Sequence, residues 1–287
     1  MDQLDWNLIR VLHETRSMTK AAEVLYISSP AILYRVRRME KEYRTPLFSK
    51  NNKGVSLTSA GLRLLSFADL MLQYDSYIYS QVNSKGEEIS GTIEIGATGN
   101  FFMHELAAQI KDFHTKYPGI MIRITIDSSI QLIHKLAASQ LMLAITRGKP
   151  QWNGPVETIF TEPHIIVSAY PINNTLLHTM PYLTNDSPTS TPFSSWLEEY
   201  FEKDLPKRSK IQLSGDSLTL KALVMQGLGW AIIPYTHLYK EDGLYSKPLL
   251  HKDGTPYQLQ TNLLYAEACK DFDTYQAYIS HLREFFS

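Results

Sequence analysis

The chain has 287 residues, a length that suits two or three domains rather than one hydrophobic core. Hydrophobic residues make up 44% of it and charged residues 20%, which is ordinary for a globular protein and excludes a disordered chain. No apolar run approaches the roughly 20 residues that cross a bilayer, the acidic N-terminus is unlike a secretory signal, and the single Cys269 excludes an intramolecular disulfide. We therefore expect a cytoplasmic protein with no membrane partner.

The formal net charge of −1 hides an uneven distribution of charge. Between residues 28 and 63 the chain carries eight lysines and arginines and only two carboxylates, Glu40 and Glu42. Such a run most often belongs to a solvated helix face. Here it coincides with two short helices joined by a tight connection, which favours a nucleic-acid partner.

Three short helices are predicted at the N-terminus. Apolar residues spaced for one stripe between Leu4 and Leu12 indicate the first helix. In the second helix Ser17 is the expected cap, and the small residues Ala21 and Ala22 would let two helices cross closely.

The third predicted helix is the basic one. Ser28 or Ser29 is its expected cap, and Pro30 is expected in the first turn, where a missing N–H costs nothing. Its apolar stripe is predicted to consist of Ile32, Val36, Met39 and Tyr43. The opposite face, which we expect to be free for a partner, carries Ser29, Leu33, Tyr34 and Arg37.

A hairpin and a long helix are predicted next. Residues 47–48 and 55–57 flank the turn-rich stretch 51–54, which is typical of a two-stranded wing. From Thr58 onward apolar residues recur at helical spacing until Gly86, and a helix of that extent is about 40 Å long. We expect it to pack against a copy of itself; the alternative is that it lies on its own C-terminal region.

Beyond Gly91 predicted strands and helices alternate, which indicates parallel strand pairing with right-handed crossovers. The expected strands are 92–95, 120–126, 141–145, 165–169 and 230–233, and the expected helices are 103–116, 130–138, 193–202, 218–226 and 272–286. The polar, proline-bearing loop 185–192 is expected at a rim.

Several short motifs along these elements resemble those of the LysR-type transcriptional regulators, and the resemblance covers the whole chain. In the N-terminal part the matching residues are 19–22, 28, 30–31, 37–40, 46–48 and 58–61. In the C-terminal part they are residues 91–96, Tyr117-Pro118-Gly119 before a strand, and residues 224–230 followed by Pro234. Each piece is weak alone, but the ordered set at these spacings is highly specific.

The resemblance implies a fold of two parts joined by a helix. An N-terminal all-α winged helix-turn-helix domain would span residues 1–57, and a long linker helix with a hinge, used for dimerisation, would span residues 58–90. A C-terminal α/β effector domain of two lobes, similar to periplasmic binding proteins, would span residues 91–287. Its first lobe would comprise residues 91–161 and 267–287, and its second lobe residues 162–266.

The resemblance also implies that the third helix and the wing bind DNA. In such interfaces phosphate contacts set position and base-edge contacts set sequence. The expected phosphate contacts are Arg35, Arg37 or Arg38, Lys50 and Lys53. The residues expected at or near the bases are Ser28, Ser29, Pro30, Ala31, Leu33 and Tyr34.

Three reading positions depart from the family pattern. Ser29 replaces the usual glutamine, Leu33 a common serine and Tyr34 a common arginine. Serine cannot pair bidentately with adenine as glutamine does, and leucine offers only an apolar contact to a thymine methyl. We therefore expect the general role to be kept and the operator preference to differ; for Leu33 and Tyr34 the alternative is ordinary helix packing.

The family's pocket loops, carried over by position, place a small-molecule effector in the crevice between the lobes. The expected contacts are Thr98, Gly99, Asn100, Ser128, Ser129, Thr146 and Arg147. Hydroxyls and amides at helix starts suit an anionic group, and Arg147 could pair with a carboxylate; the alternative for each hydroxyl is a plain N-cap. Ser139 and Met142 stand where relatives often carry glycine and aspartate, so the finer pocket geometry is not carried over.

These expectations describe a sequence-specific DNA-binding transcriptional regulator whose operator binding or bending is modulated by an effector in the inter-lobe cleft. The alternative is a ligand-independent regulator with a vestigial sensor domain. The expected partners are double-stranded promoter DNA, an effector for which a carboxylate is the leading class, and further copies of the chain. Those copies would form a homodimer through the linker helix and then a homotetramer, with RNA polymerase as a further candidate partner.

Two other classes of protein fit the sequence less well. The nine histidines are scattered with no pair at metal-ligand spacing, residues 227–229 lack the third glycine of a dinucleotide fingerprint, and neither a nucleophile elbow nor a P-loop occurs. We therefore expect no enzyme activity, no cofactor and no metal. A free-standing solute-binding protein would have no use for residues 1–86.

Overall fold

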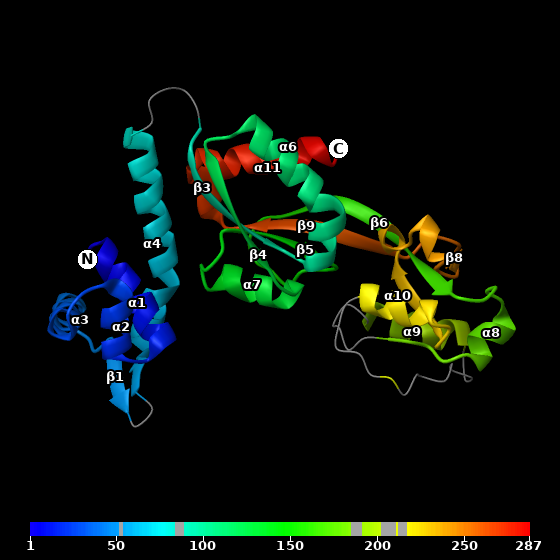
Figure 1. The fold of residues 1–287 in the computed structure, drawn as a ribbon, viewed down its shortest axis with the longest axis horizontal. Coiled ribbons are helices and arrows are strands. Elements are labelled where there is room, and N and C mark those ends of the chain that lie inside the picture. The colour runs from blue at the N-terminus through cyan, green and yellow to red at the C-terminus, as the bar shows by residue number, and fades with distance from the viewer. Residues whose placement is uncertain (52–53, 84–88, 185–190, 202–210, 212–216) are drawn as a thin grey trace.

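A computed structural model describes residues 1–51, 54–83, 89–184, 191–201, 211 and 217–287 of the chain. Figure 1 shows a small N-terminal head, a long helix that runs past it, and two lobes that follow. None of the helices in the described ranges is both long enough and apolar enough to span a membrane.

The head consists of three helices and a hairpin. They are α1 (Gln3–Thr15), α2 (Met18–Leu25), α3 (Ser29–Tyr43), β1 (Phe48–Asn51) and β2 (Gly54–Leu57). Ser17 caps α2 and Ser28 caps α3, because each hydroxyl accepts a hydrogen bond from a backbone N–H of the first turn at 3.3 Å. The predicted helices, their caps and the hairpin are therefore confirmed.

The core of the head forms where the three helices meet. Its buried residues are Leu8, Ile9, Leu12, Ala21, Ala22, Ile32, Val36, Met39 and Leu47. The predicted stripe of α3 is wrong at one position, Tyr43, which is 44% exposed. Tyr43 is the last residue of α3, and the chain reverses direction at Arg44, whose φ is 52°, so the ring does not reach the core.

The long helix α4 (Ser59–Asn83) begins against the hairpin, where a β-carbon has no room. A β-carbon on Gly61 would lie 2.1 Å from the backbone carbonyl oxygen of Leu47, which is much shorter than a van der Waals contact. We expect Gly61→Ala to lower the free energy of unfolding of the head by about 2 kcal/mol, because the helix must shift away from the hairpin.

Chemical denaturation of two alanine variants checks this expectation. In Gly99→Ala the new β-carbon would lie an ordinary 3.4 Å from the nearest atom, in Ile126, so this variant should change the stability by less than about 1 kcal/mol. Equal losses in the two variants would show that the approach of Gly61 to Leu47 is unimportant.

The rest of the chain is built on a sheet that, within the described residues, has seven strands in the order β4-β3-β5-β9-β6-β7, with β8 paired to β6. The strands are β3 (Gly91–Ala97), β4 (Ile120–Ile126), β5 (Leu143–Arg147), β6 (Val156–Ser168), β7 (Trp230–Pro234), β8 (Tyr245–Pro248) and β9 (Gln258–Tyr265). The helices are α5 (Gly99–Phe101), a π-helical turn (Phe102–Leu106), α6 (Ala107–Lys116), α7 (Ser129–Ala137), α8 (Asn174–Thr179), α9 (Thr191–Phe201), α10 (Ser217–Met225) and α11 (Asp273–Phe285). Short 3₁₀ turns occupy Tyr235–His237, Lys240–Asp242 and Glu267–Asp271.

Parallel pairing was predicted throughout this sheet, and it holds only at one side. β3 pairs in parallel with β4 and β5, with helices in the connections, as expected of crossovers. β5–β9, β6–β9, β6–β7 and β6–β8 are all antiparallel. For β8, β9 and the first half of β6 the prediction is wrong because these segments were not recognised as strands. The end of β6 and β7 were both predicted as strands, yet they pair antiparallel, so the alternating pattern alone did not fix the strand direction there. The expected strand 165–169 is the end of a 13-residue strand.

Two continuous strands join the two lobes. β6 pairs with β9 up to Pro163, with β7 from His164 onward and with β8 from Ile165 onward, so this strand changes partners as it passes between the lobes. Figure 1 shows β6 and β9 crossing from the lobe that holds β3, β4 and β5 to the lobe that holds α8, α9 and α10. Leu263 and Tyr265, which the division by sequence assigned to the second lobe, pack in the core of the first.

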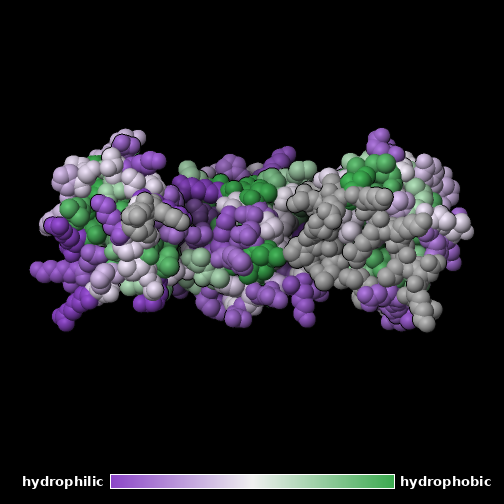
Figure 2. Space-filling view, turned by 90° about the horizontal axis from the view of Figure 1, so that it is seen from below, coloured by the Kyte–Doolittle hydropathy of each residue, from purple (hydrophilic) through white to green (hydrophobic). Residues whose placement is uncertain are grey.

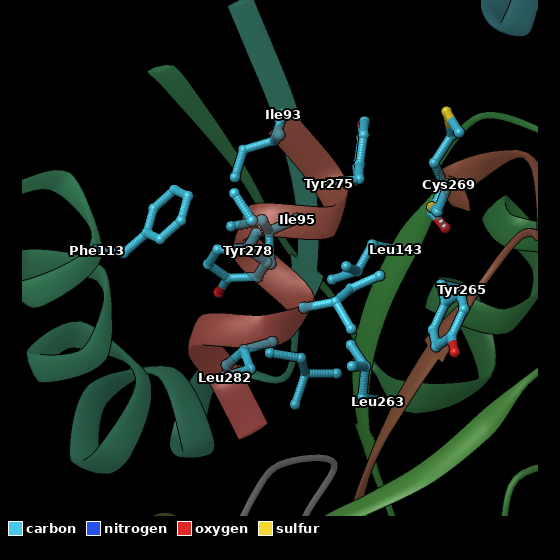
Figure 3. Packing of buried hydrophobic residues seen from close by; sticks show 14 of the residues in the cluster. Ile93, Ile95, Phe113, Leu143, Leu263, Tyr265, Cys269, Tyr275, Tyr278 and Leu282 are labelled. Carbon is cyan, nitrogen blue, oxygen red and sulfur yellow. Dashed lines mark hydrogen bonds between the residues drawn. The ribbon is translucent and has the colours of Figure 1, made fainter. Parts of the chain in front are cut away.

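The core of the first lobe is closed by the C-terminal helix. Figure 3 shows Tyr275, Tyr278 and Leu282 of α11 packed on Ile93 and Ile95 of β3, with Phe113 of α6 at one side. The predicted final helix is thus confirmed. The second lobe has its own cores, around Trp230 and around Val224.

The long helix α4 has one face on the first lobe and another face exposed. Tyr74 and Tyr77 pack on the ring of Phe272, with ring centroids 4.6 and 4.9 Å away, and the Tyr74 hydroxyl donates to Asp271 at 2.8 Å. The alternative placement of this helix, on its own C-terminal region, is therefore realised on that face. Large apolar side chains remain exposed elsewhere on α4: Leu62, Phe67, Met71, Ile78, Tyr79 and Val82.

Candidate functional site

The first candidate site is the exposed face of α3. Leu33 is 42% exposed and Tyr34 68% exposed, so the alternative of ordinary packing does not apply to either side chain. Ser28, Ser29, Pro30 and Arg37 are also exposed, and Ala31 is half-buried. Figure 2 shows hydrophilic side chains projecting from the end of the molecule at which the head lies. The predicted free face of α3 is therefore present in the fold.

Two of the predicted phosphate contacts already have partners within the head. Arg35 Nη1 donates to Asp5 Oδ1 at 2.7 Å and to Asp2 Oδ2 at 2.9 Å. Arg38 Nη2 donates to the other oxygen of Asp5 and, at 3.3 Å, to Asp2. Asp2 and Asp5 lie at the start of α1. These two carboxylates and the two guanidinium groups therefore connect α1 to the edge of the exposed face of α3.

Two of the remaining predicted phosphate contacts are exposed in the structure, and the third lies outside the described residues. Arg37 lies on the exposed face of α3, and Lys50 is exposed on β1 of the wing. Lys53 lies outside the described residues, so its prediction has no structural counterpart. Cationic side chains on a helix and on a neighbouring wing suit a phosphate backbone, since both can lie along one strand of a duplex.

The second candidate site lies where β3 and β5 end side by side. Ala97 pairs with Ile145, so the next residues, Thr98 and Thr146, are neighbours across the sheet. Both threonine hydroxyls are buried and have no hydrogen-bond partner among the residues that the structure describes. Buried polar atoms are nearly always satisfied, so two adjacent unsatisfied hydroxyls indicate a place for water or a ligand.

The two serines before α7 act within the fold. The Ser128 hydroxyl accepts from the Gln131 N–H at 3.3 Å, which makes it the N-cap of α7. The Ser129 hydroxyl accepts from the Arg147 N–H at 3.1 Å and so fixes the end of β5 to the start of α7. For Ser128 the alternative role of plain N-cap is therefore realised. Gly99 and Asn100 are half-buried in α5, directly after Thr98.

Arg147 is buried and bound to a carboxylate of the protein itself. Its guanidinium donates to Glu162 of β6, and its Nη1 lies 3.5 Å from Nε2 of His237. Glu162 also accepts from the N–H and the hydroxyl of Thr236, at 3.0 and 2.7 Å. Burial lowers the pKa of Arg147 to about 10, so it stays charged at neutral pH.

This arrangement connects the lobes through one network. Arg147 ends β5 in the first lobe, Glu162 lies at the crossing point of β6, and Thr236 and His237 belong to the second lobe. A separate contact joins the Tyr239 hydroxyl to His104, 2.6 Å from its Nδ1. Sequence reasoning missed all of these residues except Arg147, because nothing local in the sequence joins positions so far apart.

The histidines at this site are neutral at ordinary pH. Burial, with the nearby charge of Arg147, lowers the pKa of His164 to about 4 and that of His237 to about 3. His237 Nδ1 lies 2.7 Å from the Ser217 hydroxyl. In the part of the chain that the structure describes, no group of three or more potential ligands is arranged to hold a metal ion.

Comparisons with known proteins identify the family to which both parts of the chain are similar. Residues 5–62 match the family described as bacterial regulatory helix-turn-helix protein, lysR family, and residues 86–287 match the LysR substrate binding domain. The uncharacterized HTH-type transcriptional regulator YraN of Bacillus subtilis is 30% identical over 284 residues, which covers 99% of this chain and 98% of that protein.

Two solved structures show the same fold. One is full-length LysG from Corynebacterium glutamicum with bound effector Arg, at a TM-score of 0.67 and 17% identity, covering 99% of this chain and 98% of that one. The other is full-length CbnR complexed with its target DNA, at a TM-score of 0.64 and 15% identity, covering 99% and 100%. Since family matches account for both the head and the two lobes, the chain belongs to the LysR family of transcriptional regulators, with an N-terminal helix-turn-helix and a C-terminal effector-binding domain.

Proposed function

We propose that this regulator binds operator DNA sequence-specifically through α3 and the wing, and that a small molecule between the lobes modulates that binding or the bending of the DNA. The observation that carries the first half is the exposed face of α3, with Leu33 and Tyr34 beside Arg37. A helix with large apolar and cationic side chains free of its own core suits a DNA groove.

The candidate DNA contacts are the residues that were predicted from the sequence. Phosphates would be bound by Arg37 and Lys50, by Arg35 and Arg38 once released, and by Lys53, with base edges reached from residues 28–34. A footprint on the DNA upstream of the protein's own gene tests this proposal. Protection of two half-sites would support it, and salt-insensitive, unlocalised binding would sink it.

We also propose a homodimer through α4. Four of the large apolar side chains exposed on this 25-residue helix, Phe67, Met71, Ile78 and Val82, recur at helical spacing on one face, which a copy of the same helix would cover. Pairing of the effector domains would then give a tetramer, and RNA polymerase is the candidate partner at the promoter. We propose no enzyme activity and a cytoplasmic location, in line with relatives that are transcriptional regulators.

The effector site is proposed at Thr98, Gly99, Asn100, Thr146 and Arg147, with Ser128 and Ser129 shaping its wall. The unsatisfied hydroxyls of Thr98 and Thr146 favour an occupant with acceptor oxygens. A carboxylate effector that used Arg147 would compete with Glu162, so its affinity would include the loss of that internal pair.

One observation favours the second candidate function, a regulator that needs no ligand. Glu162 pairs with Arg147 and accepts from Thr236 within the chain, so the charge of Arg147 is already balanced between the lobes without a ligand. The two candidate functions differ in whether the hydroxyls of Thr98 and Thr146 bind a ligand. Calorimetric titration of the full chain with amino acids and carboxylates, followed by a repeated footprint, separates them, since a ligand acts only through different affinities for two states.

Replacing Thr146 by valine gives a sharper expectation. The two side chains have nearly the same shape, and the lost hydroxyl is buried without a protein partner, so Thr146→Val should raise the free energy of unfolding by about 1 kcal/mol. Effector affinity should fall at least tenfold if the hydroxyl contacts the ligand, a change of about 1.4 kcal/mol. Leu143→Ile, in the core of the same strand, is the control for general disturbance of β5, and unchanged effector affinity in Thr146→Val would remove this residue from the site.

A further inference from the structure

The start of α1 carries two aspartates with different degrees of burial. Asp5 is fully buried, at 0% exposure, while the side chain of Asp2 is 50% exposed. Both accept hydrogen bonds from the same two guanidinium groups, those of Arg35 and Arg38. Asp5 is therefore a fixed internal anchor, and Asp2 is an outer carboxylate on the same pair of arginines.

Asp2 has a second, separable role in the backbone. Its side chain caps α1 by accepting from the Asp5 N–H at 3.0 Å, and the Asp5 carboxylate accepts in return from the Asp2 N–H at 2.9 Å. Asparagine caps a helix about as well as aspartate does, because the cap needs an acceptor oxygen rather than a charge. The charge of Asp2 can therefore be removed while the cap is kept.

The charge itself is present under all ordinary conditions. Burial disfavours the ionised form of Asp2, but the hydrogen bonds from Arg35, from the Asp5 amide and from Arg38 outweigh it and hold its pKa at about 2. An Arg–carboxylate pair and an Arg–phosphate pair use the same planar donor geometry. A phosphate of the DNA backbone is thus chemically able to take the place of an exposed carboxylate on these arginines.

We infer, on the basis of the proposed DNA-binding function, that Asp2 is an internal substitute for a DNA phosphate, which holds Arg35 and Arg38 at the edge of the exposed face of α3 until the backbone of a duplex displaces it. Asp5 keeps both arginines in place during the exchange, because it is buried and bound to each of them. Asp2 then lowers the affinity for every DNA sequence by the same factor. Its role is to limit binding to non-operator DNA rather than to read sequence.

The test compares Asp2→Asn with Glu23→Gln in the full-length protein. Glu23 is an exposed carboxylate on α2, so its variant changes the net charge by the same amount without touching Arg35 or Arg38. Dissociation constants are measured for the footprinted operator fragment and for an unrelated duplex of equal length, at several salt concentrations. Thermal unfolding is followed for all three proteins.

We expect Asp2→Asn to bind both duplexes about two- to fivefold more tightly than the unmodified protein, the size of an exposed ion pair that no longer has to be broken. The plot of log affinity against log salt should steepen by up to about 1. Glu23→Gln should change either affinity less than twofold and leave the unfolding temperature unchanged. Asp2→Asn should unfold slightly earlier, because the fold loses a charge that Arg35 and Arg38 stabilise, but it should still be fully folded at the temperature of the binding measurements.

Three results would overturn the inference. They are an unchanged or weakened affinity in Asp2→Asn at a temperature where this variant is fully folded, an equal gain in Glu23→Gln, and a gain confined to the operator. In each of these cases the unmodified protein still binds its operator, so the proposed function stands. Absence of any DNA binding by the unmodified protein would instead remove the proposed function, and the inference with it.

Discussion

Replacing Tyr34 by glutamate is expected to raise the dissociation constant for the operator by about 100-fold, or about 2.7 kcal/mol. The side chain projects from the exposed face of α3, so the new carboxylate would face the phosphates of the duplex and repel them. The fold should be unaffected, because surface substitutions away from special features change stability by about 0.5 kcal/mol or less. Electrophoretic mobility shift with the footprinted fragment measures the change.

Tyr245→Glu is the matched control for this variant. Tyr245 is an exposed tyrosine too, on β8 in the second lobe, so the substitution adds the same charge far from the head. It should leave operator affinity within about twofold, as expected of an exposed site with no role in the interface. If Tyr34→Glu bound as tightly as Tyr245→Glu, α3 would not be the reading helix in the proposed orientation.

Glu162→Ala is expected to lower the free energy of unfolding of the effector-binding domain by about 3 to 4 kcal/mol. The loss is large because Arg147 stays buried as an unpaired charge, and the N–H of Thr236 loses its acceptor. Denaturant titration, followed by the fluorescence of Trp196 and Trp230 in the second lobe, measures the shift.

The double variant Arg147→Leu/Glu162→Leu separates the two causes of that loss. A buried ion pair replaced on both sides by apolar residues of similar volume often costs little. The double variant should therefore be more stable than Glu162→Ala, recovering about half of the loss or more. A single variant that lost less than about 1 kcal/mol would mean that water readily reaches Arg147 when Glu162 is removed.

Local features of the fold could be predicted well from the sequence. Ser17 and Ser28 cap helices because a hydroxyl before an apolar-periodic segment satisfies its own neighbouring amides, and no distant residue is needed. The same holds for the exposed face of α3, which follows from helical spacing alone. Even Ser139, where relatives often carry glycine, has the left-handed φ of 57° that explains the family preference.

Features that depend on distant residues could not be predicted in this way. Pro163 interrupts the apolar pattern of β6, and proline is rare inside strands; it is tolerated here because the strand changes partners at that point. Glu162 and Thr236 are 74 positions apart and come together only through the antiparallel pairing that the alternating pattern did not reveal. Arg147 was predicted as a ligand contact, but its internal partner depends on the same pairing.

The position of Glu162 on β6 has a mechanical consequence. It lies beside the point where β6 changes its pairing from β9 to β7 and β8, as the strand passes from the first lobe to the second. A displacement of about 1 Å next to a fulcrum becomes a movement several times larger at the far ends of two lever arms, as in hinge closure of two-lobed proteins. If the two lobes rotate about this point, a ligand that moves Arg147 away from Glu162 by about 1 Å would displace the outer end of the second lobe by several ångströms.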